Sequence, residues 1–160
     1  MQELIKRDLI TPMEAEFIVE KLKSKHNIIV LGHVGAGKTT LLRALIKAAD
    51  ALVVNMVNEE DRVAKAKYQG LLTDWANVDP NKVIALIPEI VADESIQKTT
   101  ELLRNNTHFV ATSLSDKSGN IFTKGQSEFQ EFNEALSRSN VVYVLVEQDI
   151  NKGRKVTRIF

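Results

Sequence analysis

Short apolar runs alternate along the chain with longer stretches in which apolar residues recur at helical spacing. The short runs predict buried strands, and the longer stretches, rich in helix-forming residues, predict helices. The predicted strands are residues 27–31, 51–57, 82–87, 108–112, 141–146 and 155–160. The predicted helices are residues 4–10, 12–22, 40–49, 59–70, 93–105 and 127–137, while 71–81 and 115–120 are expected to be irregular.

This order of elements predicts an α/β protein. Strands that are separated by helices pair in parallel, and helices then cover both faces of the sheet. A turn at Gly153 before the last strand predicts a C-terminal antiparallel hairpin. We therefore expect a mainly parallel sheet flanked by helices, in a single nucleotide-binding domain over residues 1–160, with N-terminal helices in 1–25 and the core in 26–160.

A capping signal marks the start of the second predicted helix. Thr11 is expected to be its N-cap, with Pro12 at the first helical position and Glu14 as the acid of a capping box. One face of this helix is expected to pack on the sheet. The residues of that face are Met13, Phe17, Ile18 and Leu22.

The link between the first strand and the next helix is a phosphate loop. It reads Gly32-His33-Val34-Gly35-Ala36-Gly37-Lys38-Thr39 and fits the pattern G-x-x-x-x-G-K-[ST] at every defined position. Glycines let several backbone N–H groups point at one anion, and the helix N-terminus adds partial positive charge. Lys38 is expected to reach the β- and γ-phosphates of a nucleotide, and Thr39 to hold Mg²⁺. The predicted nucleotide-binding residues are Gly32, Gly35, Ala36, Gly37, Lys38, Thr39 and Thr40.

Acidic residues follow two other predicted strands, at the sheet edge where ligands gather in such folds. Glu89 comes directly after Pro88, which is expected to end the third strand. It is either a solvated carboxylate or the group that organises Mg²⁺ and the attacking water. Glu59, Glu60 and Asp61 follow the second strand and serve either that role or the N-terminus of a helix, which favours negative charge.

Composition narrows the class of protein. A chain of 160 residues with 44% hydrophobic and 26% charged residues is typical of a soluble globular domain. Its 21 basic and 21 acidic residues cancel, so nucleic-acid binding is not indicated. There is no cysteine for a disulfide, a thiol nucleophile or a thiolate metal site. No apolar run is long enough for a membrane span and the N-terminus is not a signal peptide, so we expect a cytoplasmic protein.

In the order of its motifs, the chain resembles the nucleotide-binding (RecA-type) core of the type II/type IV secretion ATPases. The segment NIIVLGHVGAGKTTLLRAL resembles the phosphate-loop region of that family, and KVIALIPEI stands where the family has its Walker B signature. ELLRNNTHFVATSLS stands where a helix leads into the family's His-box strand, and VVYVLVEQDINKGRKVTRIF resembles its closing hairpin. The likeness covers most of residues 9–160 and does not include the family's N-terminal domain.

The resemblance implies an ATPase that uses ATP and Mg²⁺, with Lys38 and Glu89 as catalytic residues and with Thr39 and Glu89 at the metal. It also implies that Thr112 senses the γ-phosphate and that a neighbouring subunit supplies an arginine. The C-terminal arginines Arg154 and Arg158 are the expected source of that charge. Partners would be ATP, further copies of the chain, and proteins of a secretion or conjugation machine.

Two departures from the family pattern bear on activity. The family has arginine two residues after its Walker B glutamate, where this chain has Val91, and it has histidine in the His box, where this chain has Leu114. We therefore expect slow hydrolysis by the isolated chain. The alternative is a nucleotide-dependent switch that does not hydrolyse ATP. A small-molecule kinase is disfavoured, because residues 113–126 contain no arginine for a lid.

Overall fold

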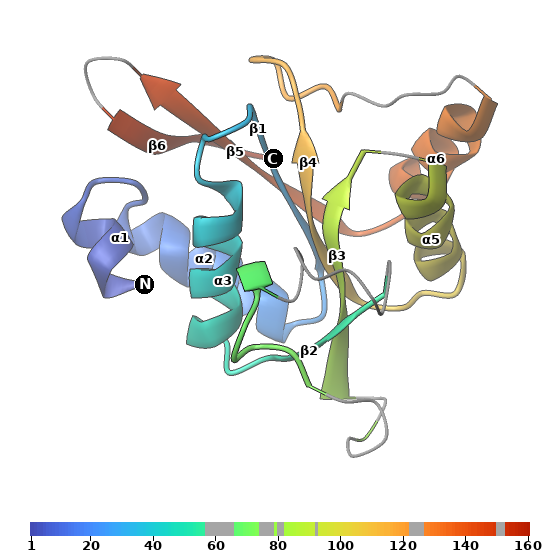
Figure 1. Cartoon of the computed structure of the whole chain (residues 1–160), viewed down its shortest axis with the longest axis horizontal. Coiled ribbons are helices and arrows are strands. Elements are labelled where there is room, and N and C mark those ends of the chain that lie inside the picture. The colour runs from blue at the N-terminus through green and yellow to red at the C-terminus, as the bar shows by residue number, and fades with distance from the viewer. Residues whose placement is uncertain (57–65, 74–78, 80–81, 92, 122–126, 150–152) are drawn as a thin grey trace.

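A computed structural model of the chain describes residues 1–56, 66–73, 79, 82–91, 93–121, 127–149 and 153–160. In this part of the chain six strands form one sheet in the order β2-β3-β4-β1-β5-β6 (Figure 1). The strands are β1 (Asn27–Gly32), β2 (Leu52–Asn55), β3 (Val83–Ile90), β4 (Phe109–Leu114), β5 (Val141–Asp149) and β6 (Gly153–Ile159). Neighbouring strands pair in parallel except β5 and β6, which are antiparallel. The predicted fold class is therefore confirmed.

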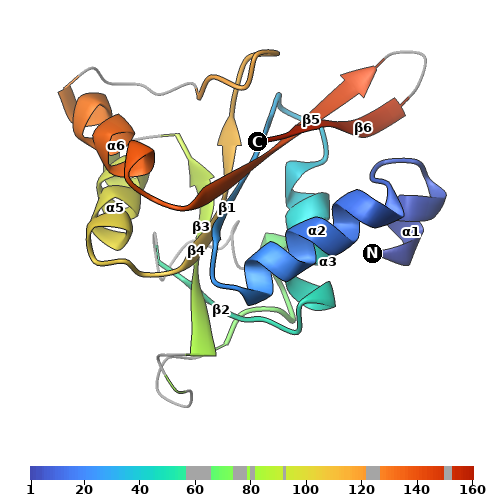
Figure 2. The same cartoon turned by 180° about the vertical axis from the view of Figure 1, so that it is seen from behind.

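Helices lie on both faces of this sheet (Figures 1 and 2). They are α1 (Gln2–Lys6), α2 (Pro12–Lys23), α3 (Lys38–Ala48), α5 (Asp93–Arg104) and α6 (Ser127–Ser137). The α2 and α3 helices lie on one face, and α5 and α6 lie on the other. None of the described helices is long and apolar enough to cross a membrane.

Alternate residues of each strand point to opposite faces, and this divides the core in two. In β1, Ile28 and Val30 belong to the cluster under α2 and α3, whereas Ile29 and Leu31 belong to the cluster under α5 and α6. Because both faces are buried, the central strand is a continuous apolar run rather than an alternating one.

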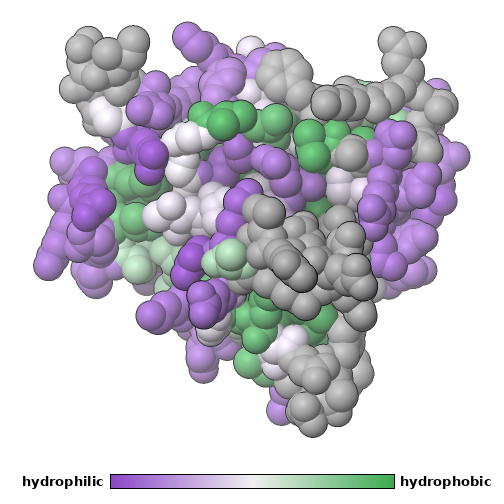
Figure 3. Space-filling model, viewed as in Figure 1, coloured by the Kyte–Doolittle hydropathy of each residue, from purple (hydrophilic) through white to green (hydrophobic). Residues whose placement is uncertain are grey.

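In the view of Figure 3, hydrophilic residues cover the helices at the two sides, and apolar residues show as smaller patches between them.

The capping box at the start of α2 is confirmed. The Glu14 carboxylate accepts a hydrogen bond from the backbone N–H of Thr11 at 2.8 Å, and the Thr11 hydroxyl accepts one from the N–H of Glu14 at 3.3 Å. Pro12 occupies the first helical position as predicted. The preceding helix, α1, begins at Gln2 and ends at Lys6. The prediction of residues 4–10 therefore placed this helix too late in the chain and made it too long.

The predicted face of α2 is wrong in part. Met13 is 79% exposed and Phe17 is 42% exposed, whereas Ile18 and Leu22 are buried together with Ala15. Residues 15, 18 and 22 form the stripe that meets the core, and residues 13 and 17 lie roughly 130–170° around the helix from the centre of that stripe, at 100° per residue. The ring of Phe17 instead packs beneath the Lys21 ammonium, 5.3 Å from the ring centroid.

Pro88 does not end β3, in contrast to the prediction. The strand runs on to Ile90, and its register against β4 shifts between Ile87 and Ile90. A proline is tolerated at such an irregularity because the ladder there does not require its missing N–H. Glu89 therefore lies inside the strand rather than after it. The predicted acidic group at residues 59–61 lies outside the described residues.

Candidate phosphate-binding site

The loop between β1 and α3 has the backbone conformation that its glycines permit. Gly32, Gly35 and Gly37 have φ values of 149°, 79° and 99°, which residues with a Cβ rarely adopt. A Cβ at Gly32 would lie 2.3 Å from the Val146 carbonyl oxygen, so the end of β1 needs glycine for its approach to β5. Gly37 is the N-cap of α3. The loop therefore delivers the chain directly into a helix N-terminus, whose first N–H groups have no partners within the helix.

Lys38 is held under this loop. Its side chain is 8% exposed, and its ammonium donates hydrogen bonds to the carbonyl oxygens of Gly32 and His33, both at 3.0 Å. Burial lowers the pKa of Lys38, and the charge of Glu89 opposes that shift. The Glu89 carboxylate is 3.9 Å from the ammonium, which is long for an ion pair. The buried charge is thus incompletely compensated, and an anion above the loop would stabilise it.

A cavity of about 330 Å³ opens at this point, at the carboxyl end of the parallel strands. The loop and α3 form one wall, and β3, the end of β4, the start of β6 and Lys67 contribute the rest. The lining residues are Val34, Gly35, Gly37, Lys38, Thr39, Thr40, Lys67, Glu89, Leu114 and Arg154. Most of the residues predicted for the site thus surround one cavity, although they come from distant parts of the chain.

The other predicted residues lie elsewhere. Ala36 is 1% exposed and is packed in the core beneath the loop. Thr112 is also buried, and its hydroxyl donates to the Pro88 carbonyl, so its side chain is already engaged within the sheet. The β4 residue that lines the cavity is Leu114. Arg158 stacks on the ring of Phe160, 4.4 Å from its centroid.

Tyr68 is a buried neighbour of the site that the sequence analysis did not single out. It is 0% exposed, and its hydroxyl has no hydrogen-bond partner among the described residues. Burial raises the pKa of Tyr68 well above its usual range, and the Thr39 side chain opposes that shift. The Thr39 side chain acts on Tyr68 electrostatically, because the two side chains do not make a hydrogen bond. No local pattern marks Tyr68, since its place depends on how its segment packs on α3, where Arg43 donates to the Lys67 carbonyl at 2.6 Å.

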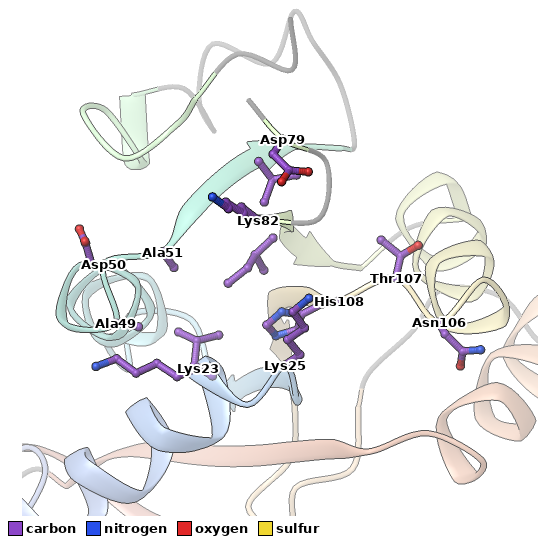
Figure 4. Close-up of a pocket in the computed structure, with 13 residues that line it drawn as sticks. Lys23, Lys25, Ala49, Asp50, Ala51, Asp79, Lys82, Asn106, Thr107 and His108 are labelled. Atoms are coloured by element: carbon purple, nitrogen blue, oxygen red, sulfur yellow. The ribbon is translucent and has the colours of Figure 1, made fainter. Parts of the chain in front are cut away.

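A second, larger pocket lies at the amino end of the same strands (Figure 4). Its volume is about 690 Å³. Charged and polar side chains surround it, namely those of Lys23, Lys25, Asp50, Asp79, Lys82, Asn106, Thr107 and His108. The His108 Nε2–H donates to the His26 carbonyl at 2.6 Å, and burial lowers the pKa of His108 to about 4.

The walls of this larger pocket contain the carboxyl ends of α2, α3 and α5. After each of these helices the chain turns through one residue with positive φ, and these residues are Lys25, Asp50 and Asn106. The N–H of the next residue then returns to a carbonyl of the last turn, as for Ala51 to Ile46 at 3.1 Å. Helix carboxyl ends carry partial negative charge, so this pocket has the opposite backbone polarity to the cavity at the phosphate loop.

Comparison with known proteins shows what fold this is. No protein-family model matches the chain, and no curated protein sequence matches it. Among solved structures, the chain is similar to the VirB11 ATPase of the Brucella suis type IV secretion system, determined in complex with sulphate, with a TM-score of 0.63 at 15% identity. The match covers 99% of this chain and 55% of that one, so the chain spans about half the length of that ATPase.

A second structure, the Pif1 helicase from Candida albicans, matches with a TM-score of 0.41 at 16% identity, covering 74% of this chain and 37% of that one. This TM-score is too low to assign a fold from the second structure. The likeness to the VirB11 ATPase therefore shows that this chain has a secretion ATPase-like fold. This agrees with the resemblance that the order of motifs indicated.

Proposed function

We propose that this chain binds ATP together with Mg²⁺ at the phosphate loop and hydrolyses it slowly when alone. The observation that carries the proposal is the state of Lys38, a buried ammonium fixed by two loop carbonyls beneath a helix N-terminus. A lysine in this position contributes a charge-assisted contact to a phosphate group. The N–H groups of the loop and of the first turn of α3 contribute further contacts.

The residues around the cavity fit ATP and Mg²⁺. The positive-φ glycines place no side chain at the points where a phosphate group would approach them. The Tyr68 hydroxyl, which has no hydrogen-bond partner in the described part of the chain, would gain one from a ligand or its water. Thr39 and Glu89 are the residues that would hold Mg²⁺, which keeps several waters and takes few protein ligands in phosphate sites. When bound, the ion would neutralise phosphate charge.

Glu89 is the proposed catalytic carboxylate. It lies in β3 across the cavity from the loop, with its side chain 37% exposed, so it can meet a water molecule as well as Lys38. In phosphoryl transfer to water, positioning and charge stabilisation provide nearly all of the rate enhancement. We assign to Glu89 the positioning of the attacking water and to Lys38 the stabilisation of phosphate charge.

The structural likeness supports this proposal and suggests partners. The similar Brucella protein is an ATPase of a type IV secretion system, and its structure holds sulphate, an oxyanion. By analogy we propose that this chain acts in the cytoplasm with further copies of itself or with proteins of a secretion or conjugation machine. We also propose that the described sheet and helices form a single nucleotide-binding domain.

Titration calorimetry with Mg²⁺-ATP tests the proposal most directly. Replacing Lys38 by alanine should remove a contact worth about 1.5–3 kcal/mol, which corresponds to a loss of at least about ten-fold in affinity. Lys82→Ala is the matched control, because it removes the same charge from the larger pocket at the other end of the sheet. Equal binding by Lys38→Ala, or no binding by the native chain, would contradict the proposal.

The second candidate function is a nucleotide-dependent switch without hydrolysis. It is favoured by Val91 and Leu114, which stand where related ATPases carry arginine and histidine, and by the engaged hydroxyl of Thr112. A phosphate-release assay separates the two functions. Tight binding without release of phosphate, at high protein concentration and with partner proteins added, would establish the switch.

A further inference from the structure

Arg154 comes from the far end of the chain and lies against the phosphate loop. It is the second residue of β6, where it pairs with Gln148 of β5, and it is exposed. A Cβ at Gly37 would lie 3.1 Å from the Cδ of Arg154 and 3.8 Å from its Nε. The arginine therefore passes over the glycine that caps α3, and it lines the same cavity as Lys38 and Glu89.

Backbone pairing holds this arginine in place. The ladder between β5 and β6 runs from the Asp149–Gly153 pair onward, so Arg154 lies within paired strand. Further along β6, the N–H of Val156 donates to the Leu9 carbonyl at 2.6 Å, and the Leu9 side chain comes within 3.9 Å of the same Cβ position at Gly37. The strand is thus fixed both to the sheet and to the segment between α1 and α2.

The Arg154 guanidinium has no counter-ion in the described part of the chain. None of those residues makes a hydrogen bond or an ion pair with it, and the carboxylate in the cavity, Glu89, is directed to Lys38. A guanidinium that no described residue neutralises, beside a helix N-terminus and a buried ammonium, adds to the positive charge of this cavity. Its planar fork of donors matches the oxygens of a phosphate group.

The geometry points to Arg154 as a phosphate-binding residue that acts in the same chain as the loop it covers. This inference rests on the proposed function and deepens it. The sequence alone suggested an arginine supplied by a neighbouring subunit. Here the chain provides that charge to its own site, where the guanidinium binds oxygen atoms of the polyphosphate and holds it against the N-terminus of α3.

The test compares Arg154→Ala with Arg154→Lys and with a control, Arg158→Ala. The control removes the same charge further along β6, where the Arg158 side chain stacks on Phe160. Affinities are measured for Mg²⁺-ATP and for inorganic tripolyphosphate. Arg154→Ala should weaken both by roughly ten-fold, since a hydrogen bond to a charged group is lost. Arg154→Lys should recover part of the loss, and Arg158→Ala should bind as the native chain does. The unfolding midpoint of Arg154→Ala without ligand should equal that of the native chain.

Mixing two variants tests whether the arginine acts within one chain. A Lys38→Ala chain cannot bind phosphate well but retains Arg154, so it would restore the affinity of an Arg154→Ala partner if the arginine worked between subunits. We expect no restoration at any mixing ratio. Restoration would overturn the assignment to the same chain.

Other results overturn the inference in distinguishable ways. An unchanged affinity of Arg154→Ala for tripolyphosphate with a weaker affinity for ATP would assign the arginine to the base or ribose. An equal loss in Arg158→Ala would mean that only the general charge of the hairpin matters. Binding that depends on Lys38 but not on Arg154 would refute this inference and leave the proposed function standing, whereas a native chain that binds neither ligand would refute both.

Discussion

The two ends of the sheet carry pockets that differ in size and in character. The pocket at the amino end is about 690 Å³, and the cavity at the carboxyl end is about 330 Å³. The smaller one faces the N-terminus of α3 and a loop of positive-φ glycines, whereas the larger one is walled by the carboxyl ends of α2, α3 and α5. Size alone would select the amino end of the sheet, whereas the backbone polarity of the two pockets favours the carboxyl end for an anion.

Lysines occur at both ends, and their settings differ. Lys38 is buried and is held by two carbonyl oxygens, while Lys82 is exposed at the rim of the larger pocket. Asp50 and Asp79 share the larger pocket with the lysines and offset their charge. The proposed phosphate site is therefore distinguished by the N-terminus of a helix and by an incompletely compensated buried cation, and not by the number of positive side chains.

The largest effect is expected from Glu89→Gln, which keeps the size of the side chain and removes its charge. Affinity for Mg²⁺-ATP should change little, because the loop provides most of the contacts. Turnover should fall by about 10²-fold or more, since a positioned carboxylate is lost. Phosphate release is measured at high protein concentration, with Glu94→Gln on the exposed start of α5 as the control.

Two outcomes of that experiment would change the assignment. Undiminished turnover in Glu89→Gln would mean that the catalytic carboxylate lies elsewhere, and Glu59, Glu60 and Asp61 would be tested next. Undetectable turnover in the native chain, with tight binding, would favour the switch.

Stabilisation of the fold by Mg²⁺-ATP should depend on the lysine at the carboxyl end of the sheet and not on the lysine at the amino end. At a hundred-fold excess over its dissociation constant, Mg²⁺-ATP should raise the free energy of unfolding by about 2.7 kcal/mol. Tripolyphosphate should give part of this effect, because the loop binds phosphate groups. Thermal melts at one ligand concentration should show the full shift in Lys82→Ala and a shift reduced by half or more in Lys38→Ala. The reverse pattern would place the ligand in the larger pocket.

The larger pocket should instead respond to pH through His108. Burial lowers the pKa of His108 to about 4, with the charges of Lys25 and His26 adding to the shift and the hydrogen bond to the His26 carbonyl opposing it. Between pH 4 and the ordinary histidine value of about 6.5, the unfolded chain binds more protons than the folded one. The free energy of unfolding should therefore rise with pH across this window.

His108→Gln should remove that dependence, which we expect to be on the order of 2 kcal/mol after allowing for the partial exposure of the ring. Urea unfolding between pH 4 and pH 7 measures it. His33→Gln, on the exposed surface of the phosphate loop, is the control and should keep the native slope. An unchanged slope in His108→Gln would show that other groups cause the dependence.

The smallest effect is expected from Tyr68→Phe at the other end of the sheet. Removing a buried hydroxyl that has no hydrogen-bond partner among the described residues should leave the free energy of unfolding unchanged or raise it by up to about 1 kcal/mol. Affinity for Mg²⁺-ATP should fall a few-fold if that hydroxyl gains its partner on binding. Denaturant unfolding and calorimetry measure the two quantities. Tyr143→Phe, on β5, is the control, and a clear loss of stability in Tyr68→Phe would contradict the prediction.

Features that depend on a few consecutive residues were predictable from the sequence. The capping box at Thr11 and Glu14 and the glycine turn into α3 use hydrogen bonds and backbone conformations that lie within a few residues of one another. The alternation of strands and helices predicted the parallel sheet and its antiparallel last strand, because connection length restricts how neighbouring strands pair. Errors arose where packing selects among similar options, as for Met13 and Phe17 on α2 and for the continuation of β3 through Pro88.

The assembly of the site depended on contacts between distant segments. β4 lies between β3 and β1 in the sheet, and in this order Glu89 comes to 3.9 Å from Lys38. The pairing of β6 with β5 brings Arg154 over Gly37, and the packing against α3 buries Tyr68. Strand order and side-chain burial are set by the balance of the whole hydrophobic core, so no motif within one segment specifies them.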